Sequence, residues 1–143
     1  MATMACKVFR QTLTIATRGQ GLQPLTDAVA AVVDVSGVTE GLCNVFIRHT
    51  SASVLLTENA DPAVHRDLER FMQRIAPEAF DYEHDAEGPD DMPAHLRSML
   101  TATTLSIPIA ARALLLGTWQ GIYLWEHRSR PHRRELIVTV LGS

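Results

Sequence analysis

The segment richest in reactive side chains is HTSASVLLTENADP, residues 49–62. It places one imidazole, four hydroxyls and three acid or amide side chains (Glu58, Asn59 and Asp61) around a short apolar run. Imidazoles and carboxylates are the usual metal ligands and proton carriers of enzymes. We therefore expect this segment to contribute to a functional site.

His49 lies where an apolar strand face turns polar. Side chains alternate between the two faces of a strand, so Cys43, Val45 and Ile47 share a face with His49 and Ser51. This pattern suits a residue at the lip of a core, where a pocket opens. For His49 taken alone, a hydrogen-bonded structural histidine is the alternative interpretation.

A second group of reactive residues lies in the acidic stretch PEAFDYEHDAEGPDDMP, residues 77–93. Six carboxylates lie between Asp81 and Asp91 with His84 among them, and His95 follows shortly after. A loop of this length is uncommon in a compact domain and is usually functional or disordered. With His49 these histidines make three imidazoles, the number used by a zinc-type site with an open position. Linear spacing does not show whether they converge, and a solvated loop is the alternative for most of the carboxylates.

A third signal is GTWQGIYLWEHR, residues 117–128. Alternation places Trp119 and Tyr123 on one face, where both rings are able to stack on a flat ligand. Gln120 and Glu126 on the other face would supply polar contacts. An aromatic core strand with a polar outer face explains the pattern equally well, and His127 is assigned to neither interpretation.

Hydrophobic periodicity predicts the elements that position these residues. Strands are predicted over 6–17, 41–57 (one long strand or two joined by a bend), 103–109, 112–117, 118–128 and 133–141. Helices are predicted over 22–37, 61–77 and 93–100, with core faces Leu25, Val29, Val32 and Val33 in the first and Val64, Leu68, Phe71 and Ile75 in the second. Strands and helices intersperse without a βαβ repeat, which favours one α+β domain, residues 1–143, with a mixed or antiparallel sheet.

Composition excludes several classes of function. The 143 residues are 46% hydrophobic and 20% charged, as in ordinary globular proteins, and a net charge of −3 gives no basic footprint for nucleic acid. No apolar run approaches the roughly 20 residues that a membrane span needs. Two distant cysteines, Cys6 and Cys43, suit a reducing compartment, and no signal peptide is recognisable, so we expect a cytoplasmic protein. Phosphate-loop, dinucleotide, GxSxG and HExxH motifs do not occur.

Taken in order, the motifs HTSAS, ENADP, YEH, DDMPAH, IPI and LGTWQGIYLWE form a series over residues 49–126. This series resembles the small bacterial and archaeal family of secondary thiamine-phosphate synthases, also called YjbQ-like proteins. The resemblance implies an α+β fold whose mixed, mainly antiparallel sheet curls into a barrel or sandwich with about three helices. It also implies a homotrimer with a histidine-rich, metal-binding site near subunit contacts.

The resemblance assigns three sets of site residues. A divalent ion, zinc-like with magnesium as the alternative, would be held by His49, His84 and His95. Glu58 or Asp61 would orient an imidazole or act as a base. The catalytic set is therefore His49, Glu58 and Asp61, and the substrate-binding set is Ser51, Asn59, Trp119 and Gln120. Between the motifs, residues 54–56 are all apolar, where the family more often alternates apolar and polar residues.

The implied reaction joins an aminopyrimidine carrying a pyrophosphate to a thiazole phosphate, with pyrophosphate leaving. Such a leaving group needs cations beside it. The chain offers Arg48, Arg97 and one late arginine but no glycine-rich phosphate cradle, so we expect this activity to be weak or secondary. The alternatives are a metal-assisted hydrolase of a small phosphorylated or cyclic substrate, and a non-catalytic trimer that binds a metabolite or metal. In each case the partner is a small molecule, not nucleic acid or a membrane.

Overall fold

The computed structural model describes residues 3–143 and confirms the α+β fold. Over these residues the strands are β1 (Lys7–Ala16), β2 (Gly21–Pro24), β3 (Gly41–Ile47), β4 (Ala52–Glu58), β5 (Thr104–Ala110), β6 (Ala113–Leu114), β7 (Gln120–Glu126) and β8 (Arg133–Gly142). The helices are α1 (Thr26–Ser36), α2 (Pro62–Ile75) and α3 (Asp91–Leu100). None of the helices in this part of the chain combines the length and apolar character of a membrane span.

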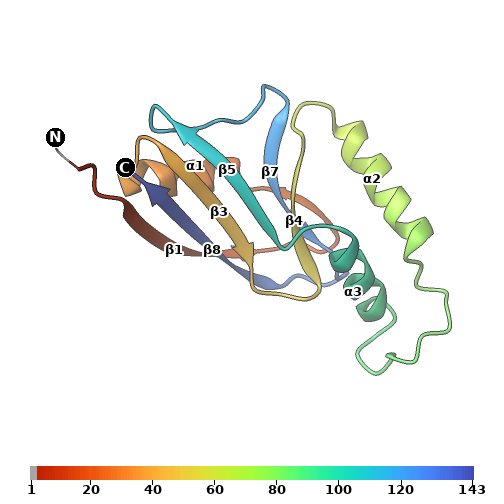
Figure 1. The fold of residues 1–143 in the computed structure, drawn as a ribbon. Coiled ribbons are helices and arrows are strands. Elements are labelled where there is room, and N and C mark those ends of the chain that lie inside the picture. The colour runs from red at the N-terminus through yellow and green to blue at the C-terminus, as the bar shows by residue number, and fades with distance from the viewer. Residues whose placement is uncertain (1–2) are drawn as a thin grey trace.

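The strands form two sheets (Figure 1). The larger has the order β1-β8-β3-β5-β6 and the smaller has the order β2-β7-β4. All pairings between these strands are antiparallel. Of the mixed or antiparallel sheet expected from the sequence, the structure has the antiparallel one. Residues 41–57 form two strands in different sheets, so the chain bends at residues 48–51 and carries His49 and Ser51 between the sheets.

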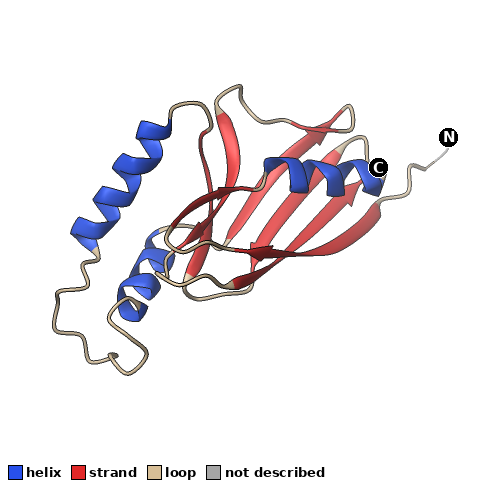
Figure 2. Ribbon diagram, turned by 180° about the vertical axis from the view of Figure 1, so that it is seen from behind, coloured by secondary structure: helices blue, strands red, loops and turns tan. Residues whose placement is uncertain are grey.

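Helix α1 lies across one face of the larger sheet (Figure 2), and its predicted core face is confirmed. Leu25, Val29, Val32 and Val33 are each at most 2% exposed, in one cluster with apolar side chains of both sheets. The helix begins at Thr26, not at residue 22, because residues 21–24 pair with β7 as β2. It ends at Gly37, whose φ of 71° is a left-handed conformation that glycine adopts readily.

Helix α2 corrects a prediction. Asp61 caps it, as expected, by accepting the Ala63 N–H at 2.9 Å. The predicted buried stripe is wrong at its C-terminal end, because Phe71 and Ile75 are 55% and 43% exposed. The residue that α2 buries well is Met72, at 6%. The physical reason is that α2 stands at one end of the molecule, away from the larger sheet (Figure 1), so part of its apolar face has nothing to cover it.

Helix α3 begins at Asp91, two residues earlier than predicted. Pro93 therefore lies inside the first turn, where a missing N–H costs no intrahelical hydrogen bond. This earlier start places Asp91 and His95 four residues apart on one helix, a spacing that brings side chains together. The last carboxylate of the acidic loop, that of Asp91, therefore lies in the first turn of α3 beside His95.

Candidate metal centre at the start of helix α3

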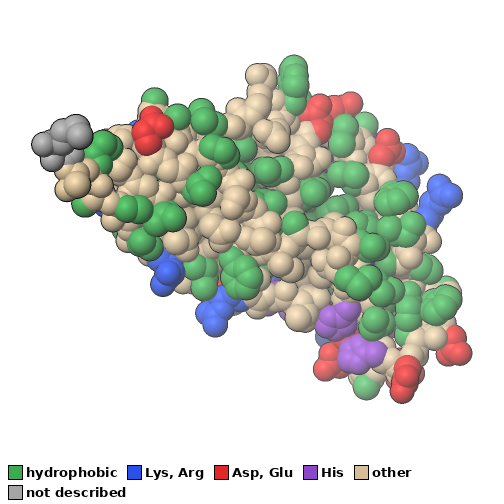
Figure 3. Space-filling model, viewed as in Figure 1, with side chains coloured by type: hydrophobic (Ala, Val, Ile, Leu, Met, Phe, Trp, Pro, Cys, Tyr) green, Lys and Arg blue, Asp and Glu red, His purple; other side chains and the backbone are tan. Residues whose placement is uncertain are grey.

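Two imidazoles converge on one carboxylate at the start of α3. His84 Nε2 lies 2.6 Å from Asp91 Oδ2, and His95 Nε2 lies 3.3 Å from the same oxygen. One ligand atom from each of the three residues falls within 4.8 Å of the others, and the two imidazole centroids are 5.4 Å apart. Histidine side chains accordingly gather beside acidic ones at the α3 end of the surface (Figure 3).

The three residues differ in how firmly they are held. Asp91 is 2% exposed, whereas the side chain of His95 is 31% exposed and that of His84 is 46% exposed. His95 Nδ1 donates to the Thr50 carbonyl at 3.1 Å. A proton fixed on Nδ1 leaves Nε2 of the neutral ring without one, facing Asp91, which is the arrangement that a metal-ligating histidine needs. The centre is therefore rigid on the Asp91 side and open to solvent on the His84 side.

Arg128 fixes the carboxylate from the opposite side. Its Nη1 donates to Asp91 Oδ1 at 2.7 Å and its Nε donates to Asp90 Oδ2 at 3.0 Å. Burial alone would raise the pKa of both carboxyl groups. For Asp91 the hydrogen bond from His84 and the charge of Arg128 reverse this and lower the pKa. For Asp90 the hydrogen bonds from Arg128 and Ser129 lower the pKa to about 2, so both groups are ionised at neutral pH.

This donor set fits a divalent ion. Two imidazole nitrogens with one carboxylate oxygen are a ligand set found in catalytic zinc and non-haem iron sites. Ligand atoms bonded to a tetrahedral ion at about 2.0–2.1 Å lie roughly 3.3 Å apart. The His95–Asp91 separation of 3.3 Å already matches, and the His84–Asp91 separation of 2.6 Å is shorter, so His84, on an exposed loop, has to shift to complete the geometry. Three protein ligands leave at least one position for another molecule.

The structure does not bring His49 to this centre. Its Nε2 accepts the Glu135 N–H at 2.8 Å, and its Nδ1 lies 3.4 Å from Arg134 Nη1. Burial, assisted by the charge of Arg134, lowers the pKa of His49. Asp91 takes the third place that the sequence analysis gave to His49. The spacing Asp91–His95 within DDMPAH was the signal for it, but it has meaning only once Asp91 is known to be helical.

Apart from Ser51, the remaining predicted residues lie at the opposite end of β4, as a second group. Glu58 ends this strand opposite Gln120 of β7, and the Asn59 side chain donates to the Thr118 carbonyl at 3.2 Å. Trp119 is 64% exposed. Six residue steps separate Ala52 from Glu58, roughly 20 Å of strand. Within one chain this group therefore does not share a pocket with His84, and the catalytic and substrate-binding roles assigned to it stay predictions.

Ser51 and His127 belong to the protein interior. Ser51 Oγ accepts from Arg134 Nη2 at 3.0 Å. His127 is fully buried, with Nε2 2.8 Å from Ser53 Oγ, and burial lowers its pKa to about 3. The partners in this interior network are Glu126 and Arg134. Glu126 was expected to offer a polar contact to a ligand, and its pairing with Arg134 was not predicted, since the two come from β7 and β8 in different sheets.

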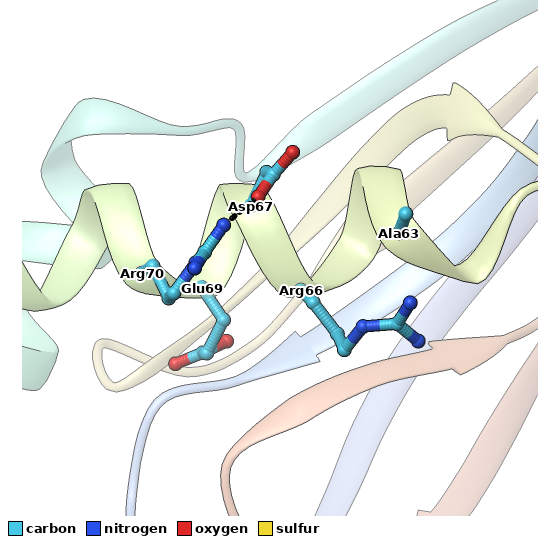
Figure 4. Close-up of a pocket in the computed structure, with 5 residues that line it drawn as sticks. All are labelled: Ala63, Arg66, Asp67, Glu69 and Arg70. Atoms are coloured by element: carbon cyan, nitrogen blue, oxygen red, sulfur yellow. Dashed lines mark hydrogen bonds and ion pairs between the residues drawn. The ribbon is translucent and has the colours of Figure 1, made fainter.

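Two hollows in the surface are lined by ionisable side chains. The larger, about 590 Å³, runs along α2 and is lined by Ala63, Arg66, Asp67, Glu69 and Arg70 (Figure 4). Its carboxylates are committed, Asp67 to Arg70 and Glu69 to Arg97 and Trp125. A smaller hollow of about 330 Å³ is lined by His84, so the reactive groups adjoin the smaller of the two.

Comparison with known proteins places the chain. A model of the family described as UPF0047 protein YjbQ-like matches residues 11–143. The chain belongs to this YjbQ-like family. It is 55% identical to the UPF0047 protein sll1880 of Synechocystis over 94% of this chain and 95% of that protein. It is 42% identical to the UPF0047 protein YjbQ of Escherichia coli O157:H7 over 94% and 99% of the two chains.

Solved structures of YjbQ-like proteins share the fold. A YjbQ/UPF0047 family protein from Clostridium acetobutylicum, an orthologue of Bacillus subtilis YugU, is 35% identical and superposes with a TM-score of 0.82 over 92% of this chain and 98% of its own. A protein of unknown function from Sulfolobus solfataricus superposes with a TM-score of 0.90 over 97% of this chain and 100% of its own. At 24% identity the second likeness concerns the fold alone.

Proposed function

We propose that this protein is a metal-dependent enzyme acting on a small phosphorylated molecule at the His84–Asp91–His95 centre. The observation that carries the proposal is the convergence of two imidazole nitrogens on one carboxylate oxygen at a solvent-open position. A bound divalent ion would supply positive charge to a phosphoryl or pyrophosphate oxygen. The two imidazoles favour a zinc-like ion over magnesium, which prefers oxygen ligands. Two free, widely separated cysteines agree with a cytoplasmic location.

As the reaction we propose the condensation implied by the family resemblance, as a weak or secondary activity. The hollow beside His84 supports it, because it is lined by the aromatic rings of Phe80 and Tyr82 and by carboxylates. Aromatic rings stack on a heteroaromatic substrate, and carboxylates accept hydrogen bonds from an exocyclic amine. An aminopyrimidine seated there would point its pyrophosphate toward the metal ligands. The carboxylates that line this hollow are Glu78, Asp81 and Asp85.

A second candidate is metal-assisted hydrolysis of a small phosphorylated or cyclic substrate. The observation that favours it concerns Arg97, one of the arginines expected to hold pyrophosphate. Arg97 is 2% exposed, and its guanidinium donates to Glu69 and to the Ala76 carbonyl. Arg97 is therefore not available to a substrate. A reaction with one phosphorylated substrate brings fewer negative charges to the site than a reaction with two.

We further propose that the protein assembles as a homotrimer. Its support is apolar surface: the sheet face opposite α1 exposes Val8, Leu42, Phe46 and Leu141 by 42–62%, on neighbouring strands β1, β8 and β3. Contiguous exposed apolar side chains mark association surfaces. Light scattering after size exclusion should give three times the mass of the chain, and Phe46→Glu should shift the protein toward monomer. Gln73→Glu, at an exposed position of α2 away from this face, is the control. A wild-type monomer would refute the trimer.

Metal titration tests the centre. We expect the chelator-stripped protein to bind about one zinc or cobalt ion per chain, and Asp91→Asn and His95→Ala to weaken binding by about 100-fold or more, because each removes a ligand. His49→Ala is the matched control and should bind normally, since its ring faces β8. Equal, sub-stoichiometric metal in the wild type and in His95→Ala would overturn the centre.

The reaction is tested by assaying pyrophosphate release with both phosphorylated precursors. Condensation that disappears in Asp91→Asn but persists in His49→Ala would support the first candidate. Hydrolysis of one precursor far outpacing condensation would replace it with the second. Tight retention of a precursor without any product, under every metal tried, would instead identify a non-catalytic binding protein.

A further inference from the structure

A buried ion pair lies beneath the metal centre. Glu126 is 0% exposed and Arg134 is 4% exposed. Arg134 Nε donates to Glu126 Oε1 at 2.9 Å, and Arg134 Nη2 donates to Glu126 Oε2. Thr17 Oγ1 is a second donor to Oε1, at 2.7 Å. The pair joins β7 to β8, which belong to different sheets. Two arms lead from this ion pair to the ligands of the metal centre.

The first arm leads to Asp91. Glu126 Oε2 accepts the backbone N–H of His127 at 3.1 Å and that of Arg128 at 3.2 Å. These hydrogen bonds hold the backbone just after β7, from which the Arg128 side chain extends toward α3. Arg128 then donates to Asp91 Oδ1 at 2.7 Å, so that Oδ2 is the oxygen turned to the two imidazoles.

The second arm leads to His95. Arg134 Nη2 donates to the Ser51 carbonyl at 3.2 Å and to Ser51 Oγ at 3.0 Å. The adjacent carbonyl, that of Thr50, accepts the Nδ1–H of His95 at 3.1 Å. Groups that bond the far nitrogen of a metal-ligating histidine set its tautomer and the orientation of its ring. Arg134 therefore holds the short segment that orients His95.

We infer that the Glu126–Arg134 ion pair is the positioning device of the metal centre, setting Asp91 through Arg128 and His95 through Thr50. This inference rests on the proposed function. None of the three residues belongs to the proposed ligand set, and each acts on that set through hydrogen bonds, so they are positioning residues. A buried ion pair is a weak stabiliser compared with an apolar pair of similar volume, so stability by itself does not account for it. Its two arms end on two of the three ligands, which gives it a role that an apolar pair does not fill.

The test measures metal affinity and ligand geometry in the whole protein. Cobalt absorption spectra and zinc competition are recorded for the wild type, Arg128→Gln and Arg134→Lys, with Val138→Ala as control. Val138 is buried on β8 and lies in neither arm, so its truncation destabilises the fold without touching the centre. We expect about 10- to 100-fold weaker binding in Arg128→Gln, and about 10-fold in Arg134→Lys with a changed cobalt spectrum. Val138→Ala should match the wild type, and Arg128→Lys should recover part of the loss by keeping one donor to Asp91.

The outcomes separate the inference from the proposed function. No metal binding by the folded wild type would overturn both. Normal wild-type binding with unchanged affinity and spectra in Arg128→Gln and Arg134→Lys would overturn the inference alone. An equal loss in Val138→Ala would also overturn it, by showing that the effect is general destabilisation. Should Arg134→Lys fail to fold, Ser51→Ala removes one acceptor of the second arm, and an unchanged cobalt spectrum there would count against that arm.

Discussion

Asp91 and Glu126 are two buried carboxylates with opposite surroundings. Each is at most 2% exposed, and in each an arginine helps to lower the pKa against the effect of burial. Both oxygens of Glu126 are taken by donors inside the protein, from Thr17, Arg134 and the backbone. Asp91 has only one oxygen held in this way, by Arg128, and its other oxygen faces two solvent-accessible imidazoles.

The difference shows what separates a binding carboxylate from a structural one. An ion approaching Glu126 would have to displace a buried guanidinium and two backbone N–H groups, each of which would lose a hydrogen-bond partner in the protein interior. At Asp91 the partners on the open side are imidazoles, whose ring nitrogens are able to serve as metal ligands themselves. Both carboxyl groups are buried and both have a lowered pKa, so these two properties do not identify the site. What distinguishes Asp91 is that its partners on the open side are able to exchange the carboxylate for a bound ion.

The largest expected effect comes from removing Arg134, the ion-pair partner of Glu126. Arg134→Met leaves the charge of Glu126 buried and unpaired, which should lower the free energy of unfolding by about 3–5 kcal/mol. Asp91→Asn should cost less, about 1–2 kcal/mol, because His84 and His95 are free to turn to water. Urea denaturation of both variants measures the contrast. The double variant Glu126→Leu/Arg134→Met is the control and should recover part of the loss, because it removes the unpaired charge but leaves the Arg128 N–H without its acceptor. A smaller loss in Arg134→Met than in Asp91→Asn would contradict the contrast drawn here.

Local patterns predicted the elements better than they predicted the site. The core face of α1 and the alternation of Cys43, Val45 and Ile47 follow from periodicity within one element, and the structure buries all of them. The stripe on α2 failed at Phe71, because a helical pattern shows which side chains are apolar but not how much protein lies beside the helix.

The candidate site depended on information that is not local. His84 and His95 were singled out by residue type, and the structure places both beside Asp91. The position of Asp91 depended on where helix α3 starts, which the sequence placed at Pro93, two residues too late. The ion pair between Glu126 and Arg134 joins strands of different sheets, and nothing in the spacing of the two residues announces it. Pairings of this kind are consequences of topology.

A smaller expected effect concerns how the free energy of unfolding depends on pH. It tests how completely the interior network around Glu126 is closed to solvent. His127 follows Glu126, and burial lowers its pKa from 6.5 to about 3, so it stays neutral in the folded protein over the range where the unfolded chain takes up a proton. The unfolded state then binds more protons, and stability is fully present above pH 6.5 and is lost as the pH falls toward 3. Between pH 7 and pH 5 this contributes a loss of roughly 2 kcal/mol. Urea denaturation at both values should show a fall in the wild type that exceeds the fall in His127→Gln by about that amount. An equal fall in the two proteins would mean that His127 takes up its proton without unfolding, and that the interior network is less closed than its hydrogen bonds indicate.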